Sequence, residues 1–129
     1  MNEPVPDSLD ALRIRVRDFA AARDWQRYHT PKNLVMALSV EAAELLEPFQ
    51  WLTPEQSLDL SAEQREAVRQ EIADVLIYLT RLADVLDIDL LAAAGDKLAI
   101  NARKYPVARA RGNALKYSAL PPDPDPPHD

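Results

Sequence analysis

Residues 61–86, SAEQREAVRQEIADVLIYLTRLADVL, have the longest run of helical spacing in this 129-residue chain. Ser61 begins the run, and Gln64 three residues later completes a capping-box signature. Apolar side chains then recur every three or four residues, at Val68, Ile72, Val75, Leu76, Leu79, Leu82, Ala83 and Leu86. The stretch predicts the longest helix of the fold.

Two helices are predicted on the N-terminal side of this run. Asp7 or Ser8 can cap a first helix, whose apolar residues follow at three- and four-residue spacing. Thr30 can cap a second helix over about 31–47, because the proline that follows it suits a first helical position. Pro48 and the segment after it mark the end of that helix.

One more helix is predicted on the C-terminal side. Asp87 or Asp89 can open it, and it runs to about Lys104, where Pro106 stops it. Residues 107–117 give no clear pattern.

Composition agrees with an all-α fold. The chain is 47% hydrophobic and holds two glycines, too few to supply the turns that several strands would need. Its length predicts one domain, which we assign to residues 1–118. Residues 119–129 contain the proline- and aspartate-rich segment LPPDPDPPHD, and we expect them to be a disordered tail.

Several classes of protein are disfavoured. With no cysteine, the chain has no disulfides and no thiolate metal site. A net charge of −6 gives no general attraction to nucleic-acid backbones or anionic membranes. We find no pattern of a signal peptide or membrane span and expect a soluble, cytoplasmic protein.

Two carboxylate pairs interrupt the apolar stripes of the second and third predicted helices. Glu41 lies between two leucines of its stripe, and Glu44 follows one turn later. Glu71 and Asp74 repeat this arrangement in the longest helix. If the four converged at about 6 Å, each pair would repel by roughly 3 kcal/mol at an effective dielectric near 20, which packing alone does not favour.

These acids have two interpretations. The helices could rotate slightly, so that all four carboxylates are solvated at the edge of the stripe. Alternatively, they bind a cation. Oxygen ligands without histidine or cysteine nearby favour Mg²⁺, with Mn²⁺ as a possible substitute, and the absence of an E-x-x-H pair argues against a di-iron bundle. We favour the cation site.

Three segments carry a resemblance to a known family: FAAARDWQRYHTPKNLVMALSVEAAELLEPFQW (19–51), EIADVLIYLTRLADVLDIDL (71–90) and KLAINARKYP (97–106). Together they resemble the MazG-related all-α nucleotide pyrophosphohydrolases, and most closely the dCTP pyrophosphatase branch. The resemblance implies a four-helix-type bundle, assembled as a homodimer or homotetramer. It also implies cleavage of a nucleoside triphosphate to the monophosphate and pyrophosphate, in a housecleaning role.

The resemblance also assigns roles to residues. It makes Glu41, Glu44, Glu71 and Asp74 the ligands of Mg²⁺ and the catalytic residues, with Glu41 and Glu44 as first candidates for the general base. It implies the further substrate contacts Trp25 and Trp51 around the base, and Lys97 and Asn101 near phosphate and sugar. Lys104 shares their helical face and is a candidate for the same contacts, and Tyr78, one turn beyond Asp74, is a candidate contact of the sugar.

The residues themselves leave alternatives to these substrate contacts. The tryptophans could belong to a core or an interface, Tyr78 could simply pack, and the polar face of the last helix could be solvated. Arg109, Arg111 and Lys116 could close over the phosphates.

One position departs from the pattern of the animal enzymes. They have a histidine one turn before the phenylalanine that starts the segment 19–51, where this chain has Val16, so we expect weaker selectivity for cytosine. The alternative functions are a pyrophosphohydrolase of broad specificity or a related phosphoribosyl-ATP enzyme, and a helical dimerisation module without catalysis. We interpret His29 as a loop residue.

Overall fold

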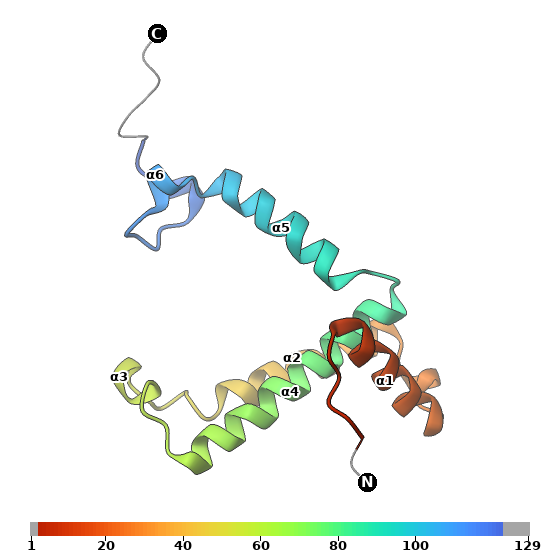
Figure 1. Cartoon of the computed structure of the whole chain (residues 1–129). Coiled ribbons are helices and arrows are strands. Elements are labelled where there is room, and N and C mark those ends of the chain that lie inside the picture. Colours follow the sequence, from red (N-terminus) through yellow and green to blue (C-terminus); the bar gives the residue numbers. More distant parts are fainter. Residues whose placement is uncertain (1–2, 123–129) are drawn as a thin grey trace. The chain divides into compact units, whose positions relative to one another are not determined.

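The structure of the protein is a computed structural model that describes residues 3–122. Within that range all regular structure is helical (Figure 1), which confirms the predicted all-α class. The elements are α1 (Leu9–Ala22), η1 (Gln26–Tyr28), α2 (Pro31–Leu46), α3 (Pro54–Ser57), α4 (Ala62–Val85), α5 (Leu90–Lys104), α6 (Val107–Ala110) and η2 (Tyr117–Ala119). They divide into two compact units, Met1–Ile88 and Asp89–Asp129.

The predicted helix starts are confirmed. Ser8 caps α1 by accepting a 3.1 Å hydrogen bond from the backbone N–H of Ala11. Thr30 caps α2 in the same way. Ser61 and Gln64 make the complete capping box before α4, in which each side chain accepts from the other residue's backbone N–H. Each oxygen satisfies a donor that the first turn of a helix would otherwise leave unpaired.

Short helices were missed. The segment after α2 contains a second capping box, formed by Thr53 and Gln56, and the four-residue α3 follows it. Its signature is visible in the sequence, but we interpreted that segment only as the end of α2. The sequence gives no prediction for residues 107–117. This segment contains α6, and its last residue is the first residue of η2.

The expected disordered tail needs correction at its start. Ala119 lies in η2, and the Leu120 side chain is buried at 8% exposure. The guanidinium of Arg109 donates to the backbone carbonyls of Leu120 and Pro121. Residues 119–121 are therefore ordered by contacts within the second unit, and residues 123–129 of the predicted tail lie outside the described residues.

Two long helices end in the same way. After α1, the N–H of Trp25 donates to the Ala20 carbonyl, and Asp24 adopts a left-handed backbone with φ of 53°. After α4, Ile88 donates to Ala83, and Asp87 has φ of 54°. These are Schellman motifs with aspartate at the position that usually holds glycine.

The long helix α4 organises the first unit, because both α1 and α2 pack against it. Leu34 of α2 and Ala20 of α1 are buried, each at 1% exposure. Val68 and Ala83 are buried on α4 itself. This arrangement sets α2 and α4 side by side, and the acidic pairs were predicted on these two helices. Among the described residues, no helix is both long and apolar enough to cross a membrane.

Candidate metal centre

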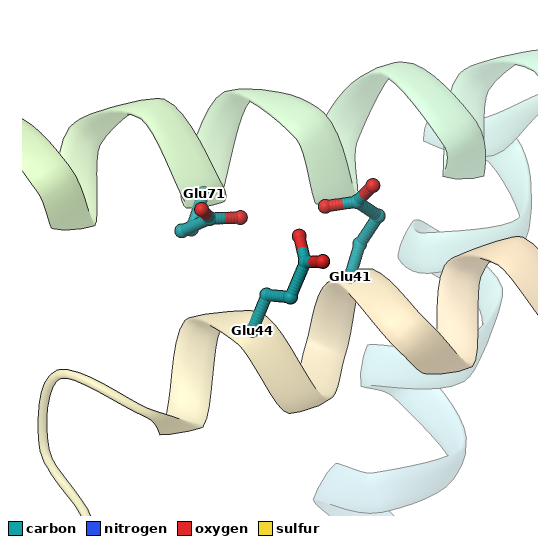
Figure 2. Close-up of side chains that lie close together, drawn as sticks. All are labelled: Glu41, Glu44 and Glu71. Carbon is teal, nitrogen blue, oxygen red and sulfur yellow. The ribbon is translucent and has the colours of Figure 1, made fainter.

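Three glutamates meet between α2 and α4 (Figure 2). Glu41 and Glu44 project from α2 toward α4, and Glu71 lies on the facing side of α4. One carboxylate oxygen from each lies within 4.8 Å of the other two. The i, i+3 spacing of the first pair places both on one face of α2, and the packing of the two helices brings the third to meet them.

The cluster is only partly open to solvent. All three glutamates are half-buried, and Oε2 of Glu41 and Oε2 of Glu71 are buried without a hydrogen-bond partner among the described residues. An unpaired buried polar atom costs free energy, and a carboxylate oxygen costs more than a neutral one. These two oxygens could therefore accept a ligand that the described residues do not provide.

The pKa values of two of the glutamates are raised, which also indicates a site that favours a positive charge. Burial, followed by contact with the Glu44 carboxyl, raises the pKa of Glu41 to about 7. Burial, followed by the charges of Glu44 and Asp74, also raises the pKa of Glu71. The repulsion expected from the sequence is thus present in the fold. A cation would relieve it, because it would stabilise the ionised carboxylates.

Asp74 stands slightly apart from the three glutamates. It lies half-buried on α4, one turn after Glu71, and is not part of the set whose oxygens lie within 4.8 Å of one another. Its charge nevertheless raises the pKa of both Glu41 and Glu71, so it belongs to the same electrostatic centre. The structure brings three of the four predicted ligands together and places the fourth nearby.

The donor set fits a metal ion. All the oxygens come from carboxylates, two of them are buried without a partner, and their mutual repulsion favours a positive charge between them. The residues Glu41, Glu44 and Glu71 could therefore bind a divalent cation.

The predicted base contacts are both exposed to solvent. Trp25 is 44% exposed and follows α1, whereas Trp51 is 87% exposed and lies in the turn between α2 and α3. Neither is a core residue of the first unit, so the interpretation of the tryptophans as core residues is excluded. Tyr78 is half-buried on α4, one turn beyond Asp74.

The predicted phosphate and sugar contacts lie on α5, in the second unit. Lys97 and Lys104 are exposed, and Asn101 is half-buried. Their spacing of four and three residues places them along one face of the helix. The Lys104 ammonium also lies 5.1 Å from the centre of the Tyr117 ring.

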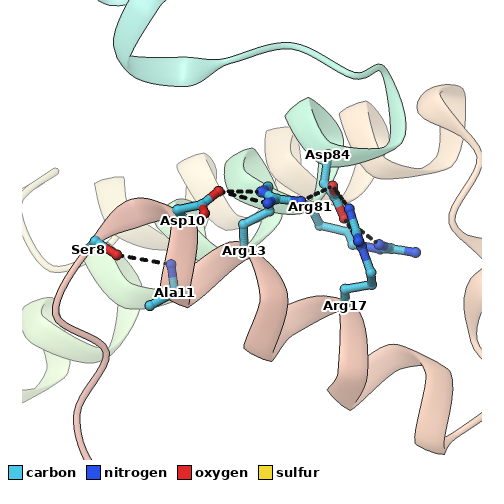
Figure 3. A network of polar contacts seen from close by, with 7 residues as sticks. All are labelled: Ser8, Asp10, Ala11, Arg13, Arg17, Arg81 and Asp84. Atoms are coloured by element: carbon cyan, nitrogen blue, oxygen red, sulfur yellow. Dashed lines mark hydrogen bonds and ion pairs between the residues drawn. The ribbon is translucent and has the colours of Figure 1, made fainter.

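An arginine network around Asp84 was not predicted from the sequence (Figure 3). The Asp84 side chain is 6% exposed and accepts from Arg13 and Arg17 of α1 and from Arg81 of α4, at 3.1, 2.9 and 3.2 Å. Hydrogen bonding to Arg17, with Arg13 adding to it, outweighs burial and lowers the pKa of Asp84. This network joins α1 to α4.

Arg81 extends the network to the segment before α2. Its Nε donates to Nδ1 of His29 at 3.1 Å, and Arg81 is itself 7% exposed. Burial, together with the Arg81 charge, lowers the pKa of His29. His29 is therefore a fixed, half-buried side chain and more than a loop residue. Its partner lies 52 residues away, so no local signal could have identified it.

Comparison with known proteins identifies the family of this chain. The chain belongs to the MazG-like family, whose sequence pattern matches residues 36–120 and so includes the whole acidic cluster. It is 42% identical to dCTP pyrophosphatase 1 of Homo sapiens over 120 residues, which cover 92% of this chain and 70% of that protein. The Bos taurus protein of the same name is 42% identical over 116 residues, covering 88% and 69%.

A solved structure has a similar fold. The crystal structure of a pyrophosphatase from Archaeoglobus fulgidus is 40% identical in sequence and superposes with a TM-score of 0.73. The match covers 82% of this chain and 99% of that one. These similarities confirm the resemblance that the sequence motifs predicted.

Proposed function

We propose that this protein is a Mg²⁺-dependent nucleoside triphosphate pyrophosphohydrolase that cleaves dCTP, or a modified dCTP, to the monophosphate and pyrophosphate. The observation that carries this proposal is the cluster of Glu41, Glu44 and Glu71, with its two unpartnered buried oxygens. The 42% identity to dCTP pyrophosphatases supports the choice of substrate.

The chain's residues have distinct tasks in this reaction. Glu41, Glu44, Glu71 and Asp74 would hold Mg²⁺, which when bound would neutralise charge on the triphosphate and acidify the attacking water. Water attacks the α-phosphorus, and the bond from that phosphorus to the bridging oxygen breaks as pyrophosphate leaves. The proton of the water passes to a carboxylate, for which Glu41 and Glu44 are the candidates.

The remaining predicted contacts bind the substrate. Trp25 and Trp51 offer exposed aromatic faces on which the base can stack. Tyr78 contacts the sugar. Lys97, Asn101 and Lys104 contact phosphate and sugar, where the two ammonium groups complement the negative charge of the nucleotide.

The test is a direct assay of products. Purified protein with dCTP and MgCl₂ should release dCMP and pyrophosphate in equal amounts, and EDTA should abolish the reaction. Release of inorganic phosphate with dCDP would instead indicate cleavage at the γ-phosphorus and contradict the proposal. A complete absence of turnover, with every common nucleotide tested, would favour the non-catalytic dimerisation module.

Assembly as a homodimer or homotetramer is part of the same proposal. Large apolar side chains remain exposed on the two helices that carry the acids, including Val35, Met36 and Val40 on α2 and Ile72 on α4, at 47–58% exposure. Apolar surface of this kind is often covered in oligomers. Light scattering should give a mass of two or four chains at micromolar concentration, whereas a mass of 14.5 kDa would contradict it.

A further inference from the structure

The Trp25 indole has two aromatic neighbours and is still partly exposed to solvent. The Phe19 ring contacts it edge-on at a centroid distance of 5.9 Å, and the His29 ring does so at 6.4 Å. Its backbone is fixed as well, by the hydrogen bond from Trp25 N–H to the Ala20 carbonyl. The Arg23 guanidinium carbon also lies over the indole, 5.9 Å from the ring centroid, and the residue remains 44% exposed, so part of the ring is still open to solvent.

His29 has a fixed orientation beside this indole. Because Nδ1 accepts the hydrogen bond from Arg81 Nε, it carries no proton, and the proton of the neutral ring resides on Nε2. The lowered pKa of His29 agrees with a neutral ring. The hydrogen bond holds the imidazole at its 64° angle to the indole plane.

Arg81 is anchored in turn. It is 7% exposed, and its Nη1 donates at 3.2 Å to Asp84, whose side chain is 6% exposed and also binds Arg13 and Arg17. Buried ion pairs of this kind resist rearrangement, because breaking them leaves a charge without a partner. A continuous series of contacts therefore joins Asp84 to Arg81, Arg81 to His29, and His29 to Trp25. Asp84 and Trp25 are 59 residues apart in the sequence.

We propose that His29 and Arg81 are positioning residues for nucleotide binding: they fix the Trp25 ring in the orientation in which a base stacks on it. This inference rests on one part of the proposed function, namely that Trp25 contacts the base. Neither residue belongs to the acidic cluster. Their loss should therefore weaken binding of the base and leave the hydrolytic step unchanged.

The experiment uses Trp25 as its own reporter. In a Trp51→Phe background Trp25 is the only tryptophan, so its fluorescence reports directly on this site. The probe is the α,β-imido analogue of dCTP with MgCl₂, which resists cleavage. Binding should change the fluorescence, and Kd follows from titration. His29→Phe keeps an aromatic ring without an acceptor, His29→Asn keeps an acceptor without the ring, and Arg81→Met removes the donor.

All three variants should weaken binding about tenfold, a loss within the range expected when base stacking is impaired. With dCTP as substrate, KM should rise by a similar factor while kcat stays within about threefold, the pattern of lost uniform binding. The double variant of His29→Phe and Arg81→Met should bind no more weakly than the worse single variant, because the two residues act through one hydrogen bond.

Arg13→Gln is the matched control. It weakens the same network at Asp84, leaves the Arg81–His29 hydrogen bond in place, and should lower Tm without changing Kd. Equal loss of binding in Arg13→Gln, or unchanged Kd in both Arg81→Met and His29→Phe, would overturn the inference. If Arg81→Met does not fold, the two His29 variants decide alone. If the Trp51→Phe parent still hydrolyses dCTP but its fluorescence does not respond to saturating analogue, Trp25 does not contact the base, and the inference fails with that assignment.

Discussion

Glu41 on α2 and Glu71 on α4 each keep one carboxylate oxygen buried and without a hydrogen-bond partner among the described residues, and the two side chains meet within 4.8 Å. Two acids in this relationship destabilise the fold when both are ionised, because each opposes the charge of the other. Their arrangement is therefore understandable as a site that a cation completes. The first three predictions follow from it.

Removing one charge should increase stability and abolish activity. In EDTA, Glu41→Gln should raise Tm by several degrees, since it removes one of the mutually repelling carboxylate charges. The same variant should lose about 10³-fold or more in kcat, because a cation ligand and a candidate general base are both removed. Differential scanning fluorimetry and pyrophosphate release measure the two effects. Activity within a few-fold of the parent protein would exclude Glu41 from the metal site.

The stability of the metal-free protein should fall as pH rises from about 5 to 8. The pKa of Glu41 is about 7 in the folded state and near its ordinary value of 4.5 when unfolded, so between these values the folded state binds more protons. The free energy of unfolding then decreases with increasing pH. The lowered pKa of His29 acts in the opposite direction below 6.5.

The effect of Glu41 is isolated by comparing the Tm of the parent protein with that of Glu41→Gln, both in EDTA. His29 contributes equally to the pH dependence of both proteins, so its effect cancels. The Tm advantage of the variant should be larger at pH 8 than at pH 5. An advantage that is the same at both pH values would mean that Glu41 titrates normally in the folded protein.

Magnesium should stabilise the folded state. At a free concentration 100 times Kd, a ligand that binds only the folded protein adds about 2.7 kcal/mol to the free energy of unfolding, which raises Tm. Glu71→Gln should remove most of this shift. Glu63→Gln is the matched control, because Glu63 is an exposed acid two turns earlier on α4, and it should retain the full shift. If both variants respond alike, the ion binds elsewhere.

Asp87 occupies a backbone conformation that glycine adopts at lower cost. At φ of 54°, a side chain is crowded against the following carbonyl. Asp87→Gly should therefore increase the free energy of unfolding by about 0.5 kcal/mol, whereas Asp87→Ala should decrease it, because alanine keeps the crowding without the local hydrogen bonding that aspartate can make. Urea denaturation distinguishes the two. Greater stability of the alanine variant would contradict this account.

Selectivity for cytosine should be modest. Stacking on tryptophan favours every base, and the half-buried Val16 on α1 has no hydrogen-bonding group to read the base edge. The ratio of kcat/KM for dCTP over dTTP or dATP should be about 10², the value typical of an apolar pocket, and Val16→His should increase it. A ratio above about 10⁴ in the parent protein would require another residue that reads the base by hydrogen bonds.

Local signals in the sequence predicted the helices and the acids well. A cap such as Thr30 acts on donors two or three residues away, so its effect is visible in the sequence itself. The same holds for Glu41 and Glu44, whose shared face follows from helical spacing. Glu71 could be added because it repeats that pattern in a helix expected to face inward.

Long-range relationships could not be predicted in this way. The contact between Arg81 and His29 depends on how α4 packs against the segment before α2, and helical periodicity does not contain that information. The small separation of Asp74 from the three glutamates is also a result of packing, since sequence spacing places it as near to Glu71 as Glu44 is to Glu41. Short elements such as α3 were missed because apolar periodicity needs more than one turn to appear.

The Schellman motif at the end of α1 makes the aromatic side chain at Trp25 an independent point of engineering. The backbone of residue 25 is held by a hydrogen bond from its N–H to the Ala20 carbonyl, which any residue other than proline can donate. Exchanging the side chain for tyrosine, phenylalanine or leucine would therefore change the size of the surface that we propose for base stacking, while the helix end stays in place. The nucleotide preference of the protein could be tuned there without altering the carboxylates on α2 and α4.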